Sequence, residues 1–236
     1  MKILITGSSQ GIGKKIFEDL KEQNEVYTIN RTDTGKNNFI CDLSNLQEVQ
    51  HLCNQLRNYH FDVLINNAGG SYPKKFEDLT VEDITKRINL NFISPLLIIQ
   101  SVVEKMKINK FGRIINISSV AAKTPVPYLH IYSSAKSALN SLTKSLAKCY
   151  KNLNITINSI CPGAVETNSS IEGRKVISKF NNMEMDEYQL SMINSTGLGR
   201  LLDCSEISNF VQFLISDKGS CFNGQSFNIC GLMEVN

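Results

Sequence analysis

The sequence predicts an α/β fold in which a parallel β-sheet carries helices on both faces. Short apolar runs alternate with longer segments of helical periodicity along the whole chain. This alternation is typical of a parallel sheet, because parallel neighbours need long crossover connections that are usually helical. The apolar runs are nearly continuous instead of alternating with polar residues, as expected for strands that are covered on both faces.

The expected elements follow one another without an internal repeat or a linker, so one domain over residues 1–236 is expected. Strands are expected at residues 2–6, 25–30, 38–41, 62–66, 113–118, 155–160 and 225–229. Helices are expected near residues 12–23, 45–59, 80–108, 132–151 and 205–216. Residues 168–200 are polar and irregular, and we expect them to form a lid over the substrate.

The composition argues against several classes of function. A net charge of +3 is too small and too scattered for a nucleic-acid or anionic-membrane surface. The seven cysteines show no C-x-x-C spacing and no histidines at ligand spacing, so we expect free thiols and no metal site. The N-terminal apolar run is too short for a signal peptide, and no later run is long enough to span a bilayer. A cytoplasmic protein is therefore expected.

A glycine-rich loop, TGSSQGIG at residues 6–13, joins the first strand to the first helix. Gly7 permits a tight turn, Gly11 lets the backbone approach a pyrophosphate, and Gly13 allows close packing of helix on strand. The spacing is G-x-x-x-G-x-G, and loop glycines alone are a weak signal. Their place before a helix N-terminus nevertheless predicts a dinucleotide site and a Rossmann-type, doubly wound, seven-stranded sheet. The residues between the glycines that are expected to contact the dinucleotide are Ser9, Gln10 and Ile12.

The end of the second strand indicates which dinucleotide binds. An acidic residue at this place would bind the ribose 2′-hydroxyl of NAD and repel a 2′-phosphate. This chain has Asn30 and Arg31 there, and the next acid is Asp33. Arg31 is able to pair with a 2′-phosphate, although an exposed loop arginine is the alternative interpretation. NADP(H) is therefore favoured, and NAD(H) remains possible.

Two residues after the third strand are expected near the adenine. The Asp42 carboxylate is able to accept a hydrogen bond from the adenine amino group, or alternatively to cap the following helix. Leu43 would add an apolar contact to the ring.

The segment HIYSSAK, residues 130–136, places a tyrosine and a lysine one helical turn apart. Side chains at positions i and i+4 share a face of a helix, so Tyr132 and Lys136 can both point into one cleft. A nearby ammonium is expected to lower the pKa of the phenol, which is about 10 in a free tyrosine. His130 is the obvious rival for acid–base work, but we interpret it as a bystander.

The glycine loop is followed in order by NNAG at residues 66–69, Ser119, Y-x-x-x-K at 132–136 and PGAVET at 162–167. This set resembles the short-chain dehydrogenase/reductase family over about residues 2–231. Residues 197–231 are most similar to the branch of bacterial 3-oxoacyl-acyl-carrier-protein reductases. The chain departs from that branch at Cys230, Gly231 and Leu232, where an acidic residue and two glycines are usual.

The resemblance implies a catalytic set of Asn89, Ser119, Tyr132 and Lys136. In such enzymes the tyrosine donates a proton to the carbonyl oxygen while the serine hydrogen-bonds the same oxygen. The lysine binds the nicotinamide ribose, and the asparagine bends its helix around a water that relays protons. Asn91 is the rival of Asn89, and Ser118 is the rival of Ser119; successive strand residues point to opposite faces.

The resemblance also assigns further cofactor contacts. Asn67 would hold neighbouring strands together through its amide, and Ala68 and Gly69 would leave room for the adenosine ribose. Pro162 and Gly163 would wrap the nicotinamide. The Val165 backbone would meet the carboxamide, and the Thr167 hydroxyl would meet the carboxamide or a phosphate.

The substrate is less defined than the chemistry. The resemblance suggests a carrier-bound 3-oxoacyl thioester, which an acidic carrier protein would deliver to a basic surface. The candidate docking residues are Lys107, Lys110, Arg113 and Arg174. The other hypotheses are the same chemistry on a small molecule, such as a sugar precursor or secondary metabolite, and a regulatory protein that binds the nucleotide without turnover. By the same analogy a homotetramer or homodimer is expected, built through the helices near 80–108 and 132–151.

Overall fold

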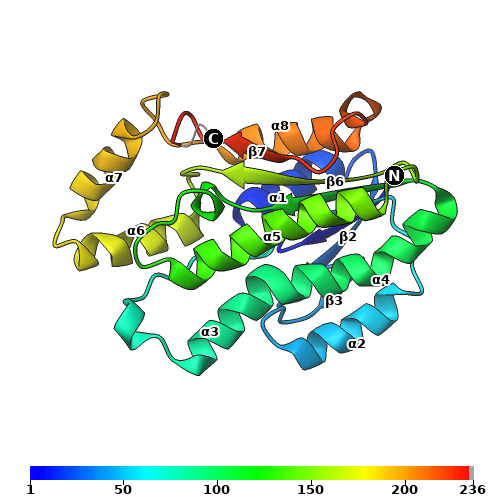
Figure 1. The fold of residues 1–236 in the computed structure, drawn as a ribbon, viewed down its shortest axis with the longest axis horizontal. Helices are drawn as coiled ribbons and strands as arrows, with labels where there is room; N and C mark the ends of the chain where they lie inside the picture. Colours follow the sequence, from blue (N-terminus) through cyan, green and yellow to red (C-terminus); the bar gives the residue numbers. More distant parts are fainter. Residues whose placement is uncertain (234–236) are drawn as a thin grey trace.

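The expected apolar runs assemble into one parallel sheet in a computed structural model that describes residues 1–233 (Figure 1). The strand order is β3-β2-β1-β4-β5-β6-β7. The strands are β1 (Lys2–Thr6), β2 (Glu25–Asn30), β3 (Asn38–Ile40), β4 (Val63–Asn66), β5 (Gly112–Ile117), β6 (Ile155–Pro162) and β7 (Ser226–Ile229). The predicted doubly wound sheet with seven parallel strands is confirmed.

Helices cover both faces of this sheet. They are α1 (Gly11–Leu20), α2 (Leu46–Leu56), α3 (Val81–Ile88), α4 (Ser94–Asn109), α5 (His130–Cys149), α6 (Asn168–Phe180), α7 (Met185–Asn194) and α8 (Cys204–Ile215). The α2, α4 and α5 helices pack on one face, and α1 and α8 pack on the other (Figure 1).

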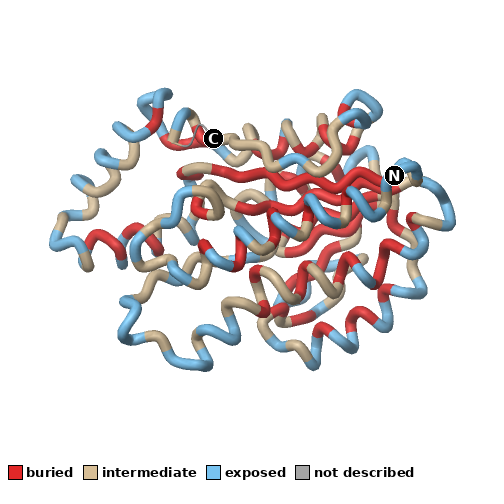
Figure 2. Tube along the Cα trace, in the orientation of Figure 1, coloured by how far each residue is buried: buried red, intermediate tan, exposed pale blue. Residues whose placement is uncertain are grey.

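The alternation of side chains along the strands divides the core into two layers. Ile3 and Ile5 of β1 pack with α1 and α8, whereas Leu4 between them packs with α2 and α4. Both layers consist mainly of buried apolar side chains, which explains why the strands read as nearly continuous hydrophobic runs. Figure 2 shows the buried residues concentrated along the strands and the inner sides of these helices.

One predicted helix is divided in the structure. The sequence indicates a continuous helix over residues 80–108, but α3 and α4 are separated by a π-helical turn at Asn89–Ile93. The Asn91 side chain donates from Nδ2 to the carbonyl of Arg87, 3.0 Å away and four residues earlier. A side chain that takes the position of an i→i−4 main-chain bond opens the helix locally. Hydrophobic periodicity does not report such a turn.

The segment 168–200 contains two helices, α6 and α7, where the sequence indicates irregular structure. They extend beyond the carboxyl end of β6 (Figure 1). The buried face of α6 consists of Gly173, Arg174, Ile177 and Ser178. Because three of these four residues are small or polar, the helix lacks the apolar stripe by which sequence reading finds helices.

Within residues 1–233, no helix is long and apolar enough to cross a membrane. The seven cysteines are free thiols, as expected, and Cys41, Cys53, Cys161 and Cys230 are buried. Among the same residues there is no group of three or more histidine, cysteine or acidic side chains placed to hold a metal ion.

Candidate active site

A cleft of about 590 Å³ opens at the carboxyl ends of the strands. The strand order reverses between β1 and β4, and ligands of open α/β sheets bind outside this switch point. The walls come from segments far apart in the sequence: the loop after β1, residues 67–72 after β4, Ser118 and Ser119 after β5, residues 162–165 and 167–170 at and after the end of β6, and side chains of α6 and α7. This volume is within the usual range for ligand sites.

The glycine loop has the close packing that its sequence predicts. Gly7 has a φ of +69°, and a Cβ there would lie 2.9 Å from the Cα of Ala68. A Cβ on Gly13 would lie 2.2 Å from the carbonyl oxygen of Gly7 and 2.3 Å from Nδ2 of Asn67. Larger residues at these two positions would push the loop, the first helix and the residues after β4 apart.

The N-terminus of α1 faces the cleft with its backbone donors available. Gln10 is the N-cap residue of α1. Within residues 1–233, its side chain forms no capping hydrogen bond with the first turn, and that turn contains no acidic residue. Gly11, Ile12 and Gly13 line the cleft. Unpaired N–H groups and the helix dipole together favour an anion at this place. These residues therefore fit the pyrophosphate of a dinucleotide.

Asn67 joins the two central strands, as expected. Its Nδ2 donates to the carbonyl oxygens of Thr6 and Gly7, at 3.0 Å and 2.9 Å. The Thr6 hydroxyl in turn accepts from the backbone N–H groups of Asn67 and Ala68, at 3.0 Å and 2.8 Å. This network fixes the glycine loop against the residues that follow β4.

The end of β2 brings one of its two candidates into the cleft. Arg31 is exposed and lines the cleft. Asn30 is buried and lies outside the lining, because its side chain accepts from the Ser8 N–H at 2.9 Å and donates to the Thr34 hydroxyl at 3.0 Å. The prediction that Asn30 contacts the cofactor is therefore not supported, and Asn30 supports the glycine loop instead. Ser9 is exposed and also lies outside the lining.

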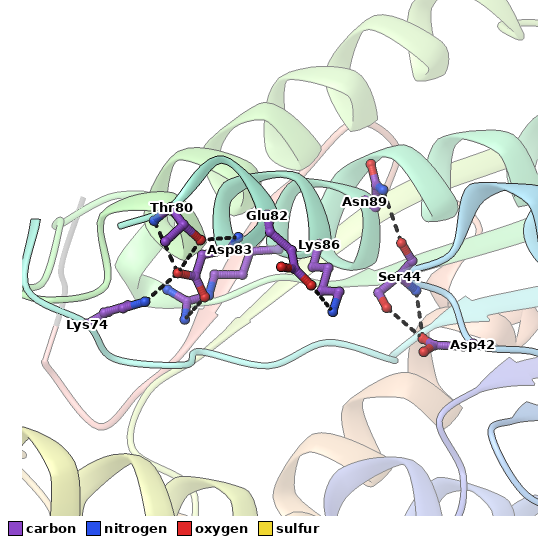
Figure 3. Close-up of polar contacts among 9 residues, drawn as sticks. Asp42, Ser44, Lys74, Thr80, Glu82, Asp83, Lys86 and Asn89 are labelled. Atoms are coloured by element: carbon purple, nitrogen blue, oxygen red, sulfur yellow. Dashed lines mark hydrogen bonds and ion pairs between the residues drawn. The ribbon is translucent and has the colours of Figure 1, made fainter. Parts of the chain in front are cut away.

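Asp42 and Leu43 both line the cleft. The alternative that Asp42 caps the next helix is wrong, because Asn45 is the N-cap of α2 and accepts from the Gln47 N–H at 3.1 Å. Asp42 forms a turn instead: its Oδ1 accepts from both the backbone N–H and the hydroxyl of Ser44 (Figure 3).

Ser119, Tyr132 and Lys136 meet at the centre of the cleft. Tyr132 and Lys136 are presented by the first turns of α5, and Ser119 follows β5. The Ser119 hydroxyl lies close enough to the Tyr132 phenol to lower its pKa by hydrogen bonding. Nζ of Lys136 lies 5.8 Å from the centre of the Tyr132 ring and donates to the carbonyl of Ile117 at 2.8 Å. Ser118, the rival of Ser119, instead donates to the backbone carbonyl of Lys136 at 3.3 Å.

The electrostatic effect on the tyrosine differs from the expected one. Burial raises the pKa of Tyr132 above its usual value of 10, and the hydrogen bond from Ser119 offsets only part of this. Burial also lowers the pKa of Lys136 to about 8. Desolvation therefore outweighs the attraction that would lower the phenol's pKa. At neutral pH the tyrosine is protonated, which is the form that donates a proton.

The structure decides between Asn89 and Asn91 differently from the sequence. Asn89 donates from Nδ2 to the Ser44 carbonyl at 3.0 Å (Figure 3). Asn91 is fully buried, and its Oδ1 accepts from the Gly70 N–H at 3.2 Å. A Cβ on Gly69 would lie 2.8 Å from Oδ1 of Asn91 and 3.2 Å from Nζ of Lys136. Asn91 is therefore the asparagine beside the lysine, and the assignment of Asn89 is corrected.

The turn after β6 closes the cleft against the glycine loop. Pro162, Gly163, Val165 and Thr167 all line the cleft, as expected. Thr167 caps α6 by accepting from the Ser170 N–H at 3.1 Å, and its methyl group lies 3.2 Å from the position of a Cβ on Gly11.

Among the lining residues that sequence reasoning missed are Arg174, Tyr188, Met192 and Met233. Three lie on α6 and α7, which the sequence did not reveal as helices. The capping box of Thr167 and Ser170 was the one local signal of a helix start in this segment.

The proposed basic docking face for a carrier protein does not exist as predicted. Arg113 and Arg174 are buried, with 2% and 3% of their surfaces exposed. Arg113 lies at the start of β5, and the cleft lies at the other, carboxyl ends of the strands. Arg113 donates to the carbonyls of Gly112 and Asn154. Lys107 and Lys110 lie at the end of α4, near the start of β5.

Residues 1–176 match the model of the short chain dehydrogenase family. The chain belongs to the short-chain dehydrogenase family. A tropinone reductase homolog of Datura stramonium is 30% identical, and the aligned region covers 100% of this chain and 92% of the homolog. The 3-oxoacyl-[acyl-carrier-protein] reductase FabG of Rickettsia felis is 28% identical over 98% of this chain and 95% of its own length.

Solved structures of the family superimpose on the whole dehydrogenase chain. An actinorhodin polyketide ketoreductase with NADPH has a TM-score of 0.90 at 27% identity, covering 99% of this chain and 97% of that one. A 4-hydroxyisoleucine dehydrogenase complexed with NADH has a TM-score of 0.83 at 26% identity, covering 98% and 97%. The family therefore includes neighbours with each nicotinamide dinucleotide, and the chain is an oxidoreductase of this family.

Proposed function

We propose that this oxidoreductase reduces a carbonyl group to a secondary alcohol with NADP(H), with Tyr132 as the proton donor. The observation that carries the proposal is the meeting of Ser119, Tyr132 and Lys136 at the centre of a cleft whose far end is the N-terminus of α1. A binding protein without turnover has no need of a buried lysine beside a protonated phenol. This arrangement disfavours the regulatory alternative.

The side chains divide the chemistry among them. The bound nicotinamide supplies the hydride. Ser119 and Tyr132 lie beside each other in the cleft, so both hydroxyls are placed to hold one substrate oxygen. Tyr132 then gives its proton to that oxygen, and the Ser119 hydroxyl stabilises the developing negative charge. Lys136 is mostly charged at neutral pH, because its pKa of about 8 lies above 7, and its charge favours the phenolate that is left behind.

Asn91 completes the proposed proton path. Its Oδ1 and the ammonium of Lys136 both lie beside Gly69, and a water molecule between them would be able to hydrogen-bond to both. Such a water would return a proton to the lysine and then to Tyr132 after each turnover.

The function is tested by following NADPH and NADH consumption with a panel of ketones, sugar precursors and acetoacetyl thioesters. We expect turnover of at least one carbonyl compound. Tight binding of NADPH without turnover of any compound in the panel would favour the regulatory alternative. A preference for acetoacetyl thioesters over free ketones would indicate a carrier-bound substrate.

Arg31→Ala is expected to lower kcat/KM for NADPH by about 10- to 100-fold, the effect of one hydrogen bond to a charged group. Its effect on NADH is expected to be small, because NADH lacks the 2′-phosphate. Lys36→Ala is the matched control, since Lys36 is an exposed cation of the same segment outside the cleft lining. Equal losses of kcat/KM with NADPH and NADH would show that Arg31 does not bind the 2′-phosphate.

Asn91→Ala is expected to lower kcat at least about tenfold, because it removes the group that positions the relay water. Asn89→Ala is the matched control: it also removes a buried amide, but one that bonds the Ser44 carbonyl. Its kcat is expected to change less than about threefold. Solvent isotope effects on kcat would separate a proton relay from a structural role. A larger loss in Asn89→Ala would restore the assignment made from the sequence.

The assembly also remains a proposal. A homo-oligomer through α4 and α5 is supported by family analogy alone, and its mass in solution would test it.

A further inference from the structure

Arg174 is a buried cation with unused hydrogen-bonding capacity. Its residue surface is 3% exposed, and it lines the cleft. Its Nε, Nη1 and Nη2 atoms are all buried and have no hydrogen-bond partner among residues 1–233. An arginine carries five N–H donors and stays charged, so burial without partners is costly. A group of this kind inside a cleft wall indicates a binding role.

The neighbouring acid does not satisfy Arg174. Oε1 of Glu166 lies 3.8 Å from Nη2, which is beyond hydrogen-bond distance, and the Glu166 side chain is 54% exposed. Burial lowers the pKa of Arg174, and Glu166 opposes this only in part. The guanidinium therefore keeps most of its donors for a ligand.

The position of Arg174 assigns it to the substrate end of the cleft. Thr167, at the start of α6, lies against the glycine loop, and Arg174 follows seven residues later. At 1.5 Å per residue, this places it about 10 Å further along the helix axis. Gly173 beside it faces Ser71 at 3.3 Å, measured from the position of a Cβ. The dinucleotide phosphates belong at the other end of the helix, beside Gly11.

The surroundings of the guanidinium suit a small organic anion. Ile177 of α6 and Met192 of α7 also line the cleft and add apolar surface to its wall. Tyr188 of α7 also lines it; burial raises the pKa of this phenol, and Arg174 acts in the opposite direction. The Tyr188 phenol and the Arg174 guanidinium provide donors for an anionic group, and Glu166 is the acid that lies near this guanidinium.

We propose that Arg174 binds a carboxylate of the substrate, so that the preferred substrates are small oxo acids and their hydroxy-acid products. This proposal rests on the proposed carbonyl reduction and adds its substrate class. Hydride from the reduced nicotinamide, which is oxidised in this step, would add to the carbonyl carbon as the C=O π bond breaks. Tyr132 supplies the proton to the oxygen, and the carboxylate remains unchanged. One guanidinium near Glu166 balances the single charge of a carboxylate better than the double charge of a phosphate.

The experiment compares acetoacetate, 4-oxopentanoate and 5-oxohexanoate with their methyl esters, in wild type, Arg174→Met and Arg174→Lys. In wild type, kcat/KM for the best acid is expected to exceed that for its ester by about 100-fold, as for a charged hydrogen-bonded pair. Arg174→Met should reduce this ratio to near one, mainly through KM of the acid, and Arg174→Lys should retain part of it. Lys175→Met is the control, because Lys175 is an exposed cation of the same helix.

A binding measurement separates this proposal from the proposed function. Titration of 4-oxopentanoate in the presence of NADP⁺ is expected to show binding to wild type and not to Arg174→Met. If carboxylates bind in this way but no carbonyl is reduced, the anion site stands and the chemistry fails. If neutral ketones and esters are reduced as well as the acids, the chemistry stands and the anion site fails.

Two further results would overturn the assignment. A weaker affinity of Arg174→Met for NADPH, measured by fluorescence, with an unchanged acid-to-ester ratio would place Arg174 on the cofactor. Preferential turnover of dihydroxyacetone phosphate over every oxo acid, lost in Arg174→Met, would identify phosphate as the bound anion.

Discussion

Tyr132→Phe is expected to lower kcat/KM for carbonyl reduction about 1,000-fold, within the range that a positioned general acid contributes. The substitution removes one oxygen atom and keeps the ring. Ser119, beside the Tyr132 hydroxyl, accepts from the Ala121 N–H at 3.1 Å and so keeps a partner in the variant. The fold and NADPH affinity should therefore be preserved. Steady-state kinetics, with NADPH affinity from fluorescence and a melting curve, would measure each effect separately.

Tyr128→Phe is the matched control for this experiment. Tyr128 lies four residues upstream, outside the cleft lining, with its ring packed against Phe180 at 4.9 Å between ring centres. Its loss of a hydroxyl should leave kcat/KM within about threefold of wild type, as is usual for a substitution away from the site. Equal activity in Tyr132→Phe and Tyr128→Phe would exclude Tyr132 as the proton donor.

Gly13→Ala is expected to destabilise the protein by about 3 kcal/mol or more, an effect typical of severe steric overlap. The added methyl carbon would lie 2.2 Å from the Gly7 carbonyl oxygen, and backbone atoms cannot rotate away. Asn67 blocks the other side, because its amide is fixed by bonds to Thr6 and Gly7. For a chain of this size the melting temperature should fall by about 10 °C. NADPH affinity should fall as well, since α1 must move away from the loop.

Gly199→Asn provides the control for a glycine substitution. Gly199 is exposed with a φ of +64°, a conformation that asparagine tolerates, and no atom of residues 1–233 lies within 4 Å of a Cβ there. Its melting temperature should stay within about 2 °C of wild type. If Gly13→Ala melts like this variant and binds NADPH normally, the loop is less tightly packed than the structure shows.

The sequence was most informative where local chemistry and geometry coincide. The strands are apolar on both faces, so their runs are easy to locate, and all seven are found within two residues of the expected bounds. Gly7 and Gly13 are glycines because of contacts in the same loop and its neighbour after β4. Tyr132 and Lys136 share a helix, so their spacing alone places them on one face.

The sequence was least informative where a role depends on distant neighbours. Asn89 and Asn91 differ by two residues in one segment, and only the π-helical turn decides which of them points toward Lys136. The same holds for Arg174, which resembles an exposed basic residue until its helix is seen packed into the cleft wall. The pKa of Tyr132 is raised, whereas the sequence predicted a lowered value. The cause is burial, which no local sequence pattern shows.

The contact between Gly11 and Thr167 has a consequence for how this protein acquires its activity. These residues come from the first and the last third of the chain, yet their segments meet across the cleft. Closing such a long loop costs conformational entropy before any contact offsets it, and parallel pairing of distant strands is slow for the same reason. The wall that Thr167 adds to the nucleotide site is thus absent from any partly folded chain in which β6 has not yet docked. Nucleotide binding during refolding therefore reports the completed sheet, whereas helix content reports only its earlier stages.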